Sequence, residues 1–291
     1  MTGVRLWVAG ARPRTLGAAI APVVVGTAAA HHDVGATSWG RAALALVVAL
    51  GMQVGVNYAN DYSDGMRGTD RARLGPVRLT ATGLATPRAV ATAAGLALLV
   101  AAAAGLALAA LVSWWLVAVG AAAIVAALGY TGGPKPYGYH GLGEVMVLAF
   151  FGFVATAGSA FVQLERVPGT AWWGSLTVGL LATAILVANN VRDLDTDAAT
   201  GKRTLAVRLG AARTRALYVA CIVGAFLAVI PAALDAPWAL LALLAIPLAV
   251  VPARVVLLAR DAPALVGALV ATARLEVLVG VLLAVGLWLS V

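Results

Sequence analysis

Long apolar runs of about 20 residues fill most of this chain and restrict how it can fold. Of its 291 residues, 62% are hydrophobic and only 11% are charged, and the mean hydropathy is +0.96. A soluble domain carries roughly 25% charged residues. A single soluble core cannot bury so much apolar surface, so most of it must face lipid. The sequence therefore predicts an all-α polytopic membrane protein.

Nine of these runs are long enough to be transmembrane helices, because a bilayer needs about 20 apolar residues. They cover residues 15–32, 40–60, 88–111, 114–130, 142–163, 171–191, 214–233, 237–258 and 274–290. Their high content of glycine and alanine favours close packing between helices. The apolar stretch 260–273 is shorter, and we expect an interfacial or re-entrant segment there.

The basic residues are distributed unequally between the connections, and this predicts the orientation of the chain. They concentrate before the first run and after the second, fourth, sixth and eighth runs, whereas the other connections carry only Arg41 and Arg166. Basic residues are enriched on the cytoplasmic side of membrane proteins, where they also attract anionic lipid. We therefore expect a cytoplasmic N-terminus, and we assign the net charge of +8 to cytoplasmic loops rather than to nucleic-acid binding.

Six of the nine aspartates lie in two short clusters, residues 57–70 and 189–197, each at the predicted cytoplasmic end of an apolar run. Within each cluster two aspartates are three or four residues apart: Asp61 with Asp64, and Asp193 with Asp197. On a helix, either spacing places the two carboxylates on one face, one turn apart. Such carboxylates repel each other unless a cation lies between them.

Mg²⁺ is bound by one or two carboxylates, by water and by phosphate oxygens of the substrate. The clusters therefore predict a site for two Mg²⁺ ions bridged by a diphosphate. The alternative is that each cluster is a solvated helix end whose acids lie together by chance. An asparagine precedes the first predicted ligand of each cluster by four residues (Asn57 and Asn189), and this repetition disfavours the alternative.

The repetition also indicates two weakly related halves, about residues 1–130 and 131–291, within a single domain that spans 1–291. Each cluster is followed by a basic loop with a similar tetrapeptide, Pro-Val-Arg-Leu at 76–79 and Ala-Val-Arg-Leu at 206–209. Two related halves that meet at one site are a common membrane architecture.

Cationic side chains near the clusters are candidates for binding the diphosphate, because they stabilise the charge that develops on a leaving group. The candidates are Lys135 in the loop at 130–140, Lys202 and Arg203 after the second cluster, and Arg67, Arg71, Arg73 and Arg78 after the first. Lys135 is one of only two lysines and lies in a loop rich in glycine and proline, which also carries Tyr130, Tyr137 and Tyr139. Cytoplasmic flanks that contact lipid headgroups explain most of the other arginines.

Arg12 and Arg14 precede the first run and are candidates for recognising an anionic aromatic substrate, because guanidinium groups bind carboxylates in a bidentate geometry. A positive cytoplasmic flank explains them equally well. Glu144, Arg274 and Glu276 lie within apolar runs, where ionisable residues are functional candidates. A structural Arg–Glu pair is the equal alternative.

In their order along the chain, these motifs resemble the UbiA superfamily of intramembrane aromatic prenyltransferases. The two Asp motifs carry the resemblance to the superfamily. Three further stretches are similar to the branch that prenylates 1,4-dihydroxy-2-naphthoate: Arg-Pro-Arg-Thr at 12–15, Tyr-Thr-Gly-Gly-Pro-Lys-Pro at 130–136 and Gly-Lys-Arg-Thr-Leu-Ala-Val-Arg-Leu-Gly at 201–210.

The resemblance implies nine transmembrane helices around a central cavity, in the plasma membrane, with the active site on the cytoplasmic side. It implies transfer of a polyprenyl group from polyprenyl diphosphate to 1,4-dihydroxy-2-naphthoate with loss of CO₂, which gives demethylmenaquinone for menaquinone biosynthesis. It implies Mg²⁺, and neither nucleic acid nor an obligate protein partner. By position, the family's motifs match Asn57, Asn60, Asp61, Asp64, Asn189, Asp193 and Asp197.

The first motif departs from the family's usual spacing. Many members space the final acids of this motif four residues apart, whereas Asp61 and Asp64 are three apart here, and the position four residues after Asp64 is Gly68. Asp70 is the candidate for the missing metal ligand.

Three alternatives use similar residues. Asp61-Tyr-Ser-Asp64-Gly65 fits a fragment of the CDP-alcohol phosphotransferase motif, but the second acid pair lies more than a hundred residues away instead of in the next turn and helix. An ion-coupled transporter could use carboxylates at helix ends, although acids beside many cations suit a diphosphate better than a permeating ion. Another aromatic prenyltransferase, such as one that acts on 4-hydroxybenzoate, is the nearest alternative.

Overall fold

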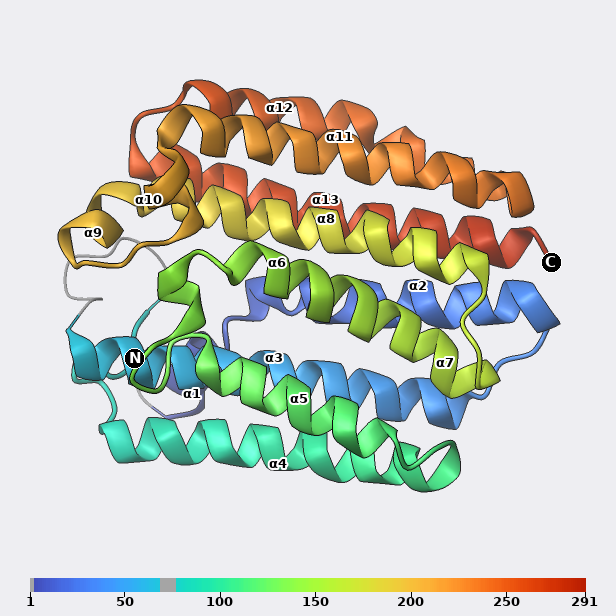
Figure 1. The fold of residues 1–291 in the computed structure, drawn as a ribbon, viewed down its shortest axis with the longest axis horizontal. Helices are drawn as coiled ribbons and strands as arrows, with labels where there is room; N and C mark the ends of the chain where they lie inside the picture. Colours follow the sequence, from blue (N-terminus) through green and yellow to red (C-terminus); the bar gives the residue numbers. More distant parts are fainter. Residues whose placement is uncertain (1–2, 69–76) are drawn as a thin grey trace.

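The structure is a computed structural model that describes residues 3–68 and 77–291. Within these residues every regular element is helical, and Figure 1 shows the helices packed side by side in one bundle. In chain order the elements are α1 (Val4–Ala11), η1 (Pro13–Thr15), α2 (Gly17–Val34), α3 (Trp39–Arg67), α4 (Pro87–Leu111), α5 (Leu116–Gly129), η2 (Tyr137–His140), α6 (Gly143–Val147), η3 (Leu148–Ala157), α7 (Gly158–Leu164), α8 (Gly169–Arg192), α9 (Leu194–Ala199), α10 (Leu205–Leu209), α11 (Ala211–Asp235), η4 (Pro237–Ala245), α12 (Ile246–Leu258) and α13 (Ala262–Leu289).

Seven helices in the described ranges are long and apolar enough to cross a membrane, and an eighth span results if residues 4–34 cross it as one bent pair. The bend between residues 4–15 and 17–34 is 52°. The apolar helix α5 has only 14 residues, so it is shorter than the other spans. The protein is therefore a multi-pass all-helical membrane protein, while the helix number of nine and the orientation of the N-terminus stay predictions.

The prediction for residues 260–273 is wrong. These residues form no separate interfacial or re-entrant segment, because the single helix α13 runs through them from Ala262. The Oδ1 atom of Asp261 accepts a hydrogen bond from the amide of Ala264 at 2.9 Å and caps the helix, and Pro263 occupies its first turn. Arg274 resembled the polar start of a helix, but it lies in the middle of one.

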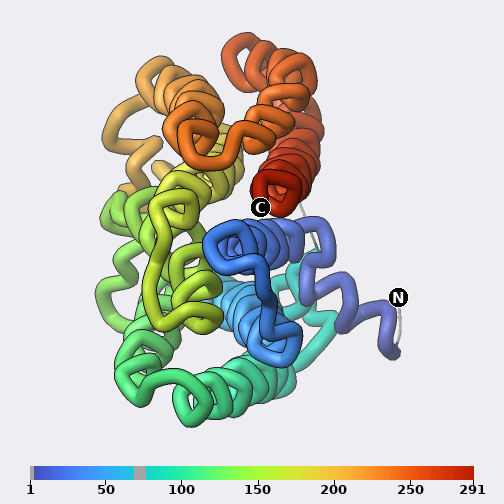
Figure 2. The backbone as a smooth tube through the Cα atoms, turned by 90° about the vertical axis from the view of Figure 1, so that its right-hand side faces the viewer, coloured from blue at the N-terminus to red at the C-terminus, as the bar shows by residue number. Residues whose placement is uncertain are grey.

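The helix α2 lies inside the bundle, where it contacts α3, α7, η3, α8 and α13 (Figure 2). Glycine makes this close packing possible. A Cβ atom at Gly26 would collide with the carbonyl oxygen of Thr156 and would come within 2.8 Å of Ser159 Cβ. Gly152 and Gly179 bring η3 and α8 together in the same way, because a Cβ at Gly179 would lie 2.7 Å from Gly152 Cα.

The span that begins at Gly143 contains ten residues of π-helix, Leu148–Ala157. A π-helix is wider than an α-helix and usually occurs as a single turn. Here it carries both Gly152 and Thr156, which lie against Gly179 of α8 and Gly26 of α2. The irregular segment therefore shapes the packing around α2.

The described residues of both acid clusters, 57–68 and 189–197, lie at one end of the bundle. Figure 1 shows the C-terminal end of α3 at the same end as α9 and α10, whereas the C-terminus of the chain lies at the other end. α3 and α8 run toward this end, so the first cluster ends one helix and the second cluster follows another. The predicted metal site needs both acidic helix ends at the same end of the bundle, and the structure has this arrangement.

We expect Gly26→Ala to lower the thermal unfolding temperature, because the added methyl group must displace the backbone of η3. Overpacking of this kind costs about 1–3 kcal/mol. The measurement is unfolding of the purified protein in detergent, followed by tryptophan fluorescence. Gly95→Ala is the matched control, since Gly95 is also helical and nothing lies within 4 Å of its added Cβ. Equal unfolding temperatures for the two variants would contradict the packing argument.

Candidate functional site

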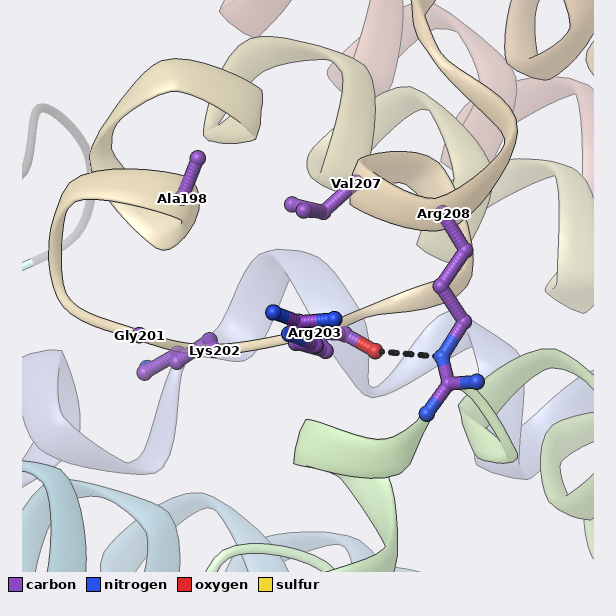
Figure 3. Close-up of a pocket in the computed structure, with 6 residues that line it drawn as sticks. All are labelled: Ala198, Gly201, Lys202, Arg203, Val207 and Arg208. Atoms are coloured by element: carbon purple, nitrogen blue, oxygen red, sulfur yellow. Dashed lines mark hydrogen bonds between the residues drawn. The ribbon is translucent and has the colours of Figure 1, made fainter.

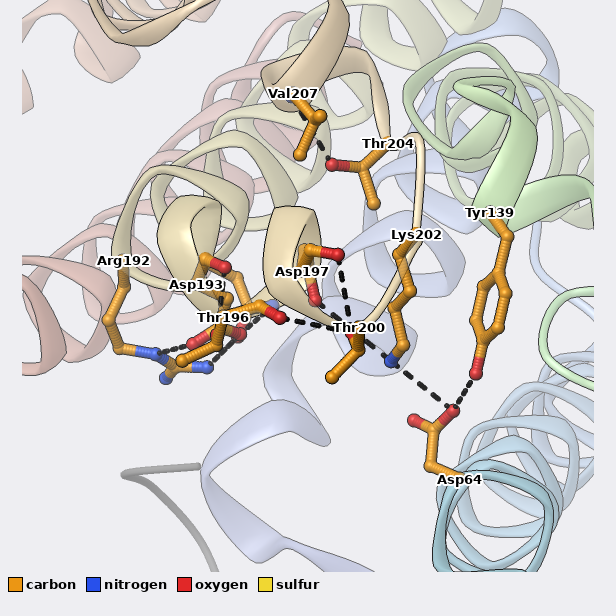
Figure 4. A network of polar contacts seen from close by, with 11 residues as sticks. Asp64, Tyr139, Arg192, Asp193, Thr196, Asp197, Thr200, Lys202, Thr204 and Val207 are labelled. Atoms are coloured by element: carbon orange, nitrogen blue, oxygen red, sulfur yellow. Dashed lines mark hydrogen bonds and ion pairs between the residues drawn. The ribbon is translucent and has the colours of Figure 1, made fainter. Parts of the chain in front are cut away.

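Lys202 joins the two acid clusters. Its Nζ atom lies 3.5 Å from Asp64 Oδ1 and 4.0 Å from Asp197 Oδ1, although Asp64 and Lys202 are 138 residues apart in the chain (Figure 4). Lys202 is only 6% exposed, and its own amide donates to the carbonyl oxygen of Asp197 at 2.9 Å. Because a charge is stable in a buried site only when it is paired, this contact fixes the position of both clusters.

Tyr139 completes the environment of Asp64. Its hydroxyl donates to Asp64 Oδ1 at 2.6 Å, and its ring centroid lies 4.7 Å from the Lys202 ammonium. The guanidinium of Arg67 lies 5.4 Å from the same ring. Asp64, Tyr139 and Lys202 therefore bring together α3, η2 and the loop after α9 (Figure 4).

Asp193 is held by its neighbour Arg192. Arg192 Nε donates to Asp193 Oδ1 at 2.7 Å, and Arg192 Nη2 donates to Asp193 Oδ2 at 2.6 Å. Asn189 accepts from the same guanidinium at 2.8 Å and donates to Asp193 Oδ2 at 3.3 Å. The guanidinium and carboxylate are 3% and 4% exposed, so this is a buried bidentate ion pair.

The second cluster is not one continuous helix. α8 ends at Arg192 and α9 begins at Leu194, with Asp193 between them. The amide of Asp197 still donates to the Asp193 carbonyl oxygen at 2.8 Å, so the turn that separates the two acids by four residues is kept.

Asp61 faces backbone amides. Its Oδ2 atom accepts from the amide of Leu79 at 2.7 Å, and its Oδ1 atom accepts from the amide of Thr80 at 2.9 Å. The side chain is fully buried. Asp61 was predicted to be a metal ligand, but each of its carboxylate oxygens already accepts a hydrogen bond from a backbone amide.

Asn57 and Gln53 fasten the N-terminal segment to α3. Asn57 Nδ2 donates to the Ala11 carbonyl oxygen at 2.9 Å and to Thr15 Oγ1 at 3.1 Å, and Gln53 Nε2 donates to the same hydroxyl at 3.1 Å. Thr15 Oγ1 in turn donates to the carbonyl oxygen of Arg12 at 2.9 Å. Arg12 adopts a left-handed backbone conformation with φ of +54°, which is rare for a residue with a side chain. Arg14 is exposed.

The loop at 130–140 packs against the end of α3. Thr131 Oγ1 donates to Asn60 Oδ1 at 2.7 Å, and Arg67 donates to the carbonyl oxygens of Thr131 and Gly133. The rings of Tyr130 and Tyr137 lie 5.5 Å apart, and burial raises the pKa of Tyr137 to about 12. The Tyr137 hydroxyl is therefore neutral at physiological pH. Lys135 lies on the exposed part of this loop.

A cavity of about 250 Å³ opens beside the second cluster (Figure 3). Three of the residues that line it are cationic: Lys202, Arg203 and Arg208. The backbone holds them in place, since the amide of Arg203 donates to the Tyr139 carbonyl oxygen at 3.0 Å and Arg208 Nε donates to the Arg203 carbonyl oxygen at 3.1 Å. A small cavity with several cations is suited to an anion such as a phosphate group.

Glu144 lies away from these contacts. Asn190 Nδ2 donates to Glu144 Oε1 at 2.9 Å, so Glu144 links α6 to α8. Glu276 is fully buried, and within the described part of the chain neither carboxylate oxygen has a hydrogen-bond partner. Arg274 is exposed, so the alternative of an Arg274–Glu276 pair does not hold.

The donor set is suitable for Mg²⁺, although no three His, Cys, Asp or Glu side chains in residues 3–68 and 77–291 gather into a metal-binding group. Asp64 and Asp197 share one cation, Lys202, and carboxylate oxygens together with phosphate oxygens are ligands that Mg²⁺ prefers. Asp70, the further predicted ligand, lies outside the described residues.

Sequence reasoning missed several residues of the site. It gave no role to Arg192, because adjacent residues on a helix do not normally face each other, and only the helix break at Asp193 allows the pair. It also gave none to Thr131, Leu79 or Thr80, whose contacts depend on where distant loops fold. The sequence analysis singled out Lys135 and gave Lys202 only a secondary role. In the structure, Lys202 is the lysine that contacts the acids.

Three comparisons with known proteins identify the family and the fold of this chain. The UbiA prenyltransferase family matches residues 19–266. A 1,4-dihydroxy-2-naphthoate octaprenyltransferase of Mycobacterium tuberculosis (strain ATCC 25618 / H37Rv) is 50% identical over 249 residues, which cover 86% of this chain and 85% of that protein.

Two solved structures share the fold. The apo structure of a UbiA homologue from Aeropyrum pernix K1 superposes with a TM-score of 0.69 at 17% identity, covering 93% of this chain and 96% of the other. A UbiA homologue from Archaeoglobus fulgidus bound to GPP and Mg²⁺ gives 0.61 at 15% identity, covering 95% and 99%. Since the family match extends over most of the chain and a relative shares half of its residues, this protein belongs to the UbiA prenyltransferase family.

Proposed function

We propose that the protein transfers a polyprenyl group from a polyprenyl diphosphate to 1,4-dihydroxy-2-naphthoate, with loss of CO₂, and so forms demethylmenaquinone. The observation that carries this proposal is the 50% identity, over most of both chains, to the naphthoate octaprenyltransferase of M. tuberculosis. The meeting of two acid clusters at Lys202, at one end of a membrane bundle, supports it.

Mg²⁺ is part of the proposal, since the A. fulgidus homologue of the same fold is bound to GPP and Mg²⁺. Asp64, Asp193 and Asp197 would hold the metal here, with Asp70 as a further predicted ligand. When bound, Mg²⁺ neutralises negative charge on a diphosphate and so makes it a better leaving group. A second ion stays a prediction.

The cations of the cavity would bind the diphosphate itself. Lys202 and Arg203 were predicted from sequence, and Arg208 joins them in the cavity lining. When the carbon–oxygen bond of the prenyl diphosphate breaks, its electron pair goes to the diphosphate oxygen. Cations that are already in place stabilise this charge without reorganisation. Arg67 lies beside the Tyr139 ring, whose hydroxyl donates to Asp64, and would add a further cation to this group.

The aromatic acceptor would bind through its carboxylate. Arg12 and Arg14 are the residues that we assign to this group, because a guanidinium matches a carboxylate in a bidentate geometry. A ring carbon of the naphthoate then forms the new carbon–carbon bond with the allylic cation, and departure of CO₂ restores aromaticity. Tyr130, Tyr137 and the apolar walls would exclude water, which otherwise captures the cation. Glu144 stays a predicted substrate contact.

We place the site on the cytoplasmic face of the plasma membrane. The C-terminal end of α3, α9 and α10 lie toward one end of the bundle (Figure 1), and the cavity beside α9 and α10 is lined by Lys202, Arg203 and Arg208. A basic end is expected to face the cytoplasm.

A membrane assay with radiolabelled polyprenyl diphosphate tests the reaction and its metal. We expect labelled product with 1,4-dihydroxy-2-naphthoate, release of CO₂ from its carboxylate, loss of activity in EDTA and recovery with added Mg²⁺. 4-Hydroxybenzoate is the competing acceptor. Preference for 4-hydroxybenzoate would show that the protein is a different kind of aromatic prenyltransferase. Full activity in EDTA would refute the proposed dependence on Mg²⁺.

Asp64→Asn and Asp197→Asn should each lower kcat by about 100-fold or more, because each removes a charge that would hold the metal and that now pairs with Lys202. Asp195→Asn is the matched control, since Asp195 lies in the second cluster but is exposed. The measurement is initial rate at saturating substrates, normalised to the amount of folded protein. Equal rates for Asp195→Asn and Asp197→Asn would be incompatible with the assigned roles.

Substitution of the two lysines, Lys202 and Lys135, should have different effects on the kinetics. Lys202→Gln should raise the KM for polyprenyl diphosphate and lower kcat, because it leaves Asp64 and Asp197 without their shared cation. Lys135→Gln tests the role predicted from sequence at an exposed position. Steady-state kinetics of both variants measure the difference. A larger loss in Lys135→Gln than in Lys202→Gln would reverse this ranking.

A further inference from the structure

An open groove lies between α1 and the start of α4, separate from the cavity beside Lys202. Its volume is about 510 Å³, within the range of about 300–1,000 Å³ that is typical of small-ligand sites. The residues that shape it are Trp7 of α1 and Arg88, Ala89, Thr92, Ala93 and Leu96 of α4. The last four recur at the helical spacing i, i+3, i+4 and i+7, so they lie on one face of α4 and form one side of the groove.

The other side of the groove, at Trp7, is fixed to α3. The hydroxyl of Tyr58 donates to the Trp7 carbonyl oxygen at 2.7 Å, and the two rings pack edge to face with their centroids 5.9 Å apart. Trp7 and Ala93 both pack against the buried cluster that contains Leu6, Tyr58 and Val90. Figure 2 shows the N-terminal segment, in dark blue, at the edge of the bundle. Packing therefore holds α1 and α4 side by side at a surface that meets lipid.

The length of α4 places the groove at the depth of lipid headgroups. The helix has 25 residues. At 1.5 Å per residue it is about 37 Å long, whereas the hydrocarbon core of a bilayer is about 30 Å thick. Exposed Trp114 and Trp115 follow its C-terminal end, and exposed tryptophan is typical of the interface between membrane and water. With that end at one interface, Arg88 reaches the headgroups of the opposite leaflet, and Leu96 lies deeper, among the acyl chains.

The charge and polarity of the groove match an anionic phospholipid. Among the described residues that line it, Arg88 carries the only charge. A guanidinium binds phosphate oxygens through parallel hydrogen bonds, and one guanidinium balances the single negative charge of a phosphodiester. A diphosphate carries more negative charge than one guanidinium balances, so the groove suits a phospholipid better than a prenyl diphosphate. The indole of Trp7 is suited to the boundary between headgroup and acyl chain, because one end of it is apolar and the other is polar.

We propose that the groove between α1 and α4 binds one anionic phospholipid, with its phosphodiester at Arg88 and an acyl chain between Trp7 and Leu96. The site does not depend on the proposed reaction. The bound lipid contacts both α1 and α4 and therefore stabilises the docking of the N-terminal segment. A ligand that binds only the folded protein raises its unfolding temperature, so this stabilisation is measurable.

Native mass spectrometry in neutral detergent, with titration by phosphatidylglycerol, tests the site. We expect Arg88→Gln to raise the Kd of the most tightly bound lipid by about tenfold, because it removes a hydrogen-bonded charge pair. Arg213→Gln is the matched control and should bind like the wild type, since Arg213 is also exposed and lies in the first turn of a span, α11. Equal Kd values for the two variants would overturn the proposal.

Competition identifies the occupant. Phosphatidylcholine, which has no net charge, should bind about tenfold more weakly than phosphatidylglycerol. Inorganic phosphate and geranyl diphosphate at the concentration of the lipid should leave phosphatidylglycerol bound. Equal binding of the two phospholipids would overturn the charge selectivity. Displacement by inorganic phosphate would assign the groove to a free anion, and displacement by geranyl diphosphate would assign it to the prenyl substrate; either result would overturn the proposal.

A bulky side chain tests the apolar part of the groove. Thr92 and Ala91 are both exposed on α4, and Thr92 lines the groove whereas Ala91 does not. We expect Thr92→Phe to weaken phosphatidylglycerol binding by about tenfold and to abolish the rise in unfolding temperature that the lipid gives, because the ring occupies the place of the acyl chain. Ala91→Phe should keep both properties. The same response of the two variants to the lipid would contradict the proposed site.

Discussion

The contact of Lys202 with Asp64 and Asp197 is the interaction on which the rest of this structure depends. In a chain with so few charges, three ionised groups in a buried position are stable only as a paired set. The set is shared between α3, which carries Asp64, and the loop that follows α9. Tyr139 adds a third element through its hydrogen bond to Asp64. One set of buried charges therefore both balances the charge of the site and joins the end of α3 to the loop after α9.

Close packing among the apolar helices positions the elements that form the contact between Lys202 and the two aspartates. α2 lies inside the bundle, and η3 approaches it so closely that only glycine fits at Gly26. Gly152 and Gly179 bring η3 against α8, the helix that leads into the second acid cluster. Because lipid offers little driving force for helix association, close backbone contacts of this kind have to hold the helices. The glycine contacts that pack the bundle therefore also position the helix that leads into the second cluster.

The sequence could predict the candidate site as a set of residue types but not as a set of contacts. Asp64, Asp197 and Lys202 were all identified from clustering, and they meet in the structure. Asn57 and Asp61 were identified by the same argument, yet they bind backbone groups of the N-terminal segment and of residues 77–85. Spacing along a helix says that side chains share a face, but it does not say what lies opposite that face. Arg192 escaped notice because its pair with Asp193 needs a helix break that spacing does not reveal.

The sequence by itself determined that the protein is helical and membrane-embedded, because a chain that is 62% hydrophobic and 11% charged can only bury its surface in lipid. It also determined that acids concentrate at two helix ends, and it located most spans to within a few residues. The tertiary structure alone decided which acid meets which cation and that residues 260–273 belong to α13. It alone also decided that η3 is a π-helix. The physical reason is that hydrophobicity and helical periodicity act locally along the chain, whereas the pairing of buried charges depends on residues that are distant in sequence and are brought together only by packing.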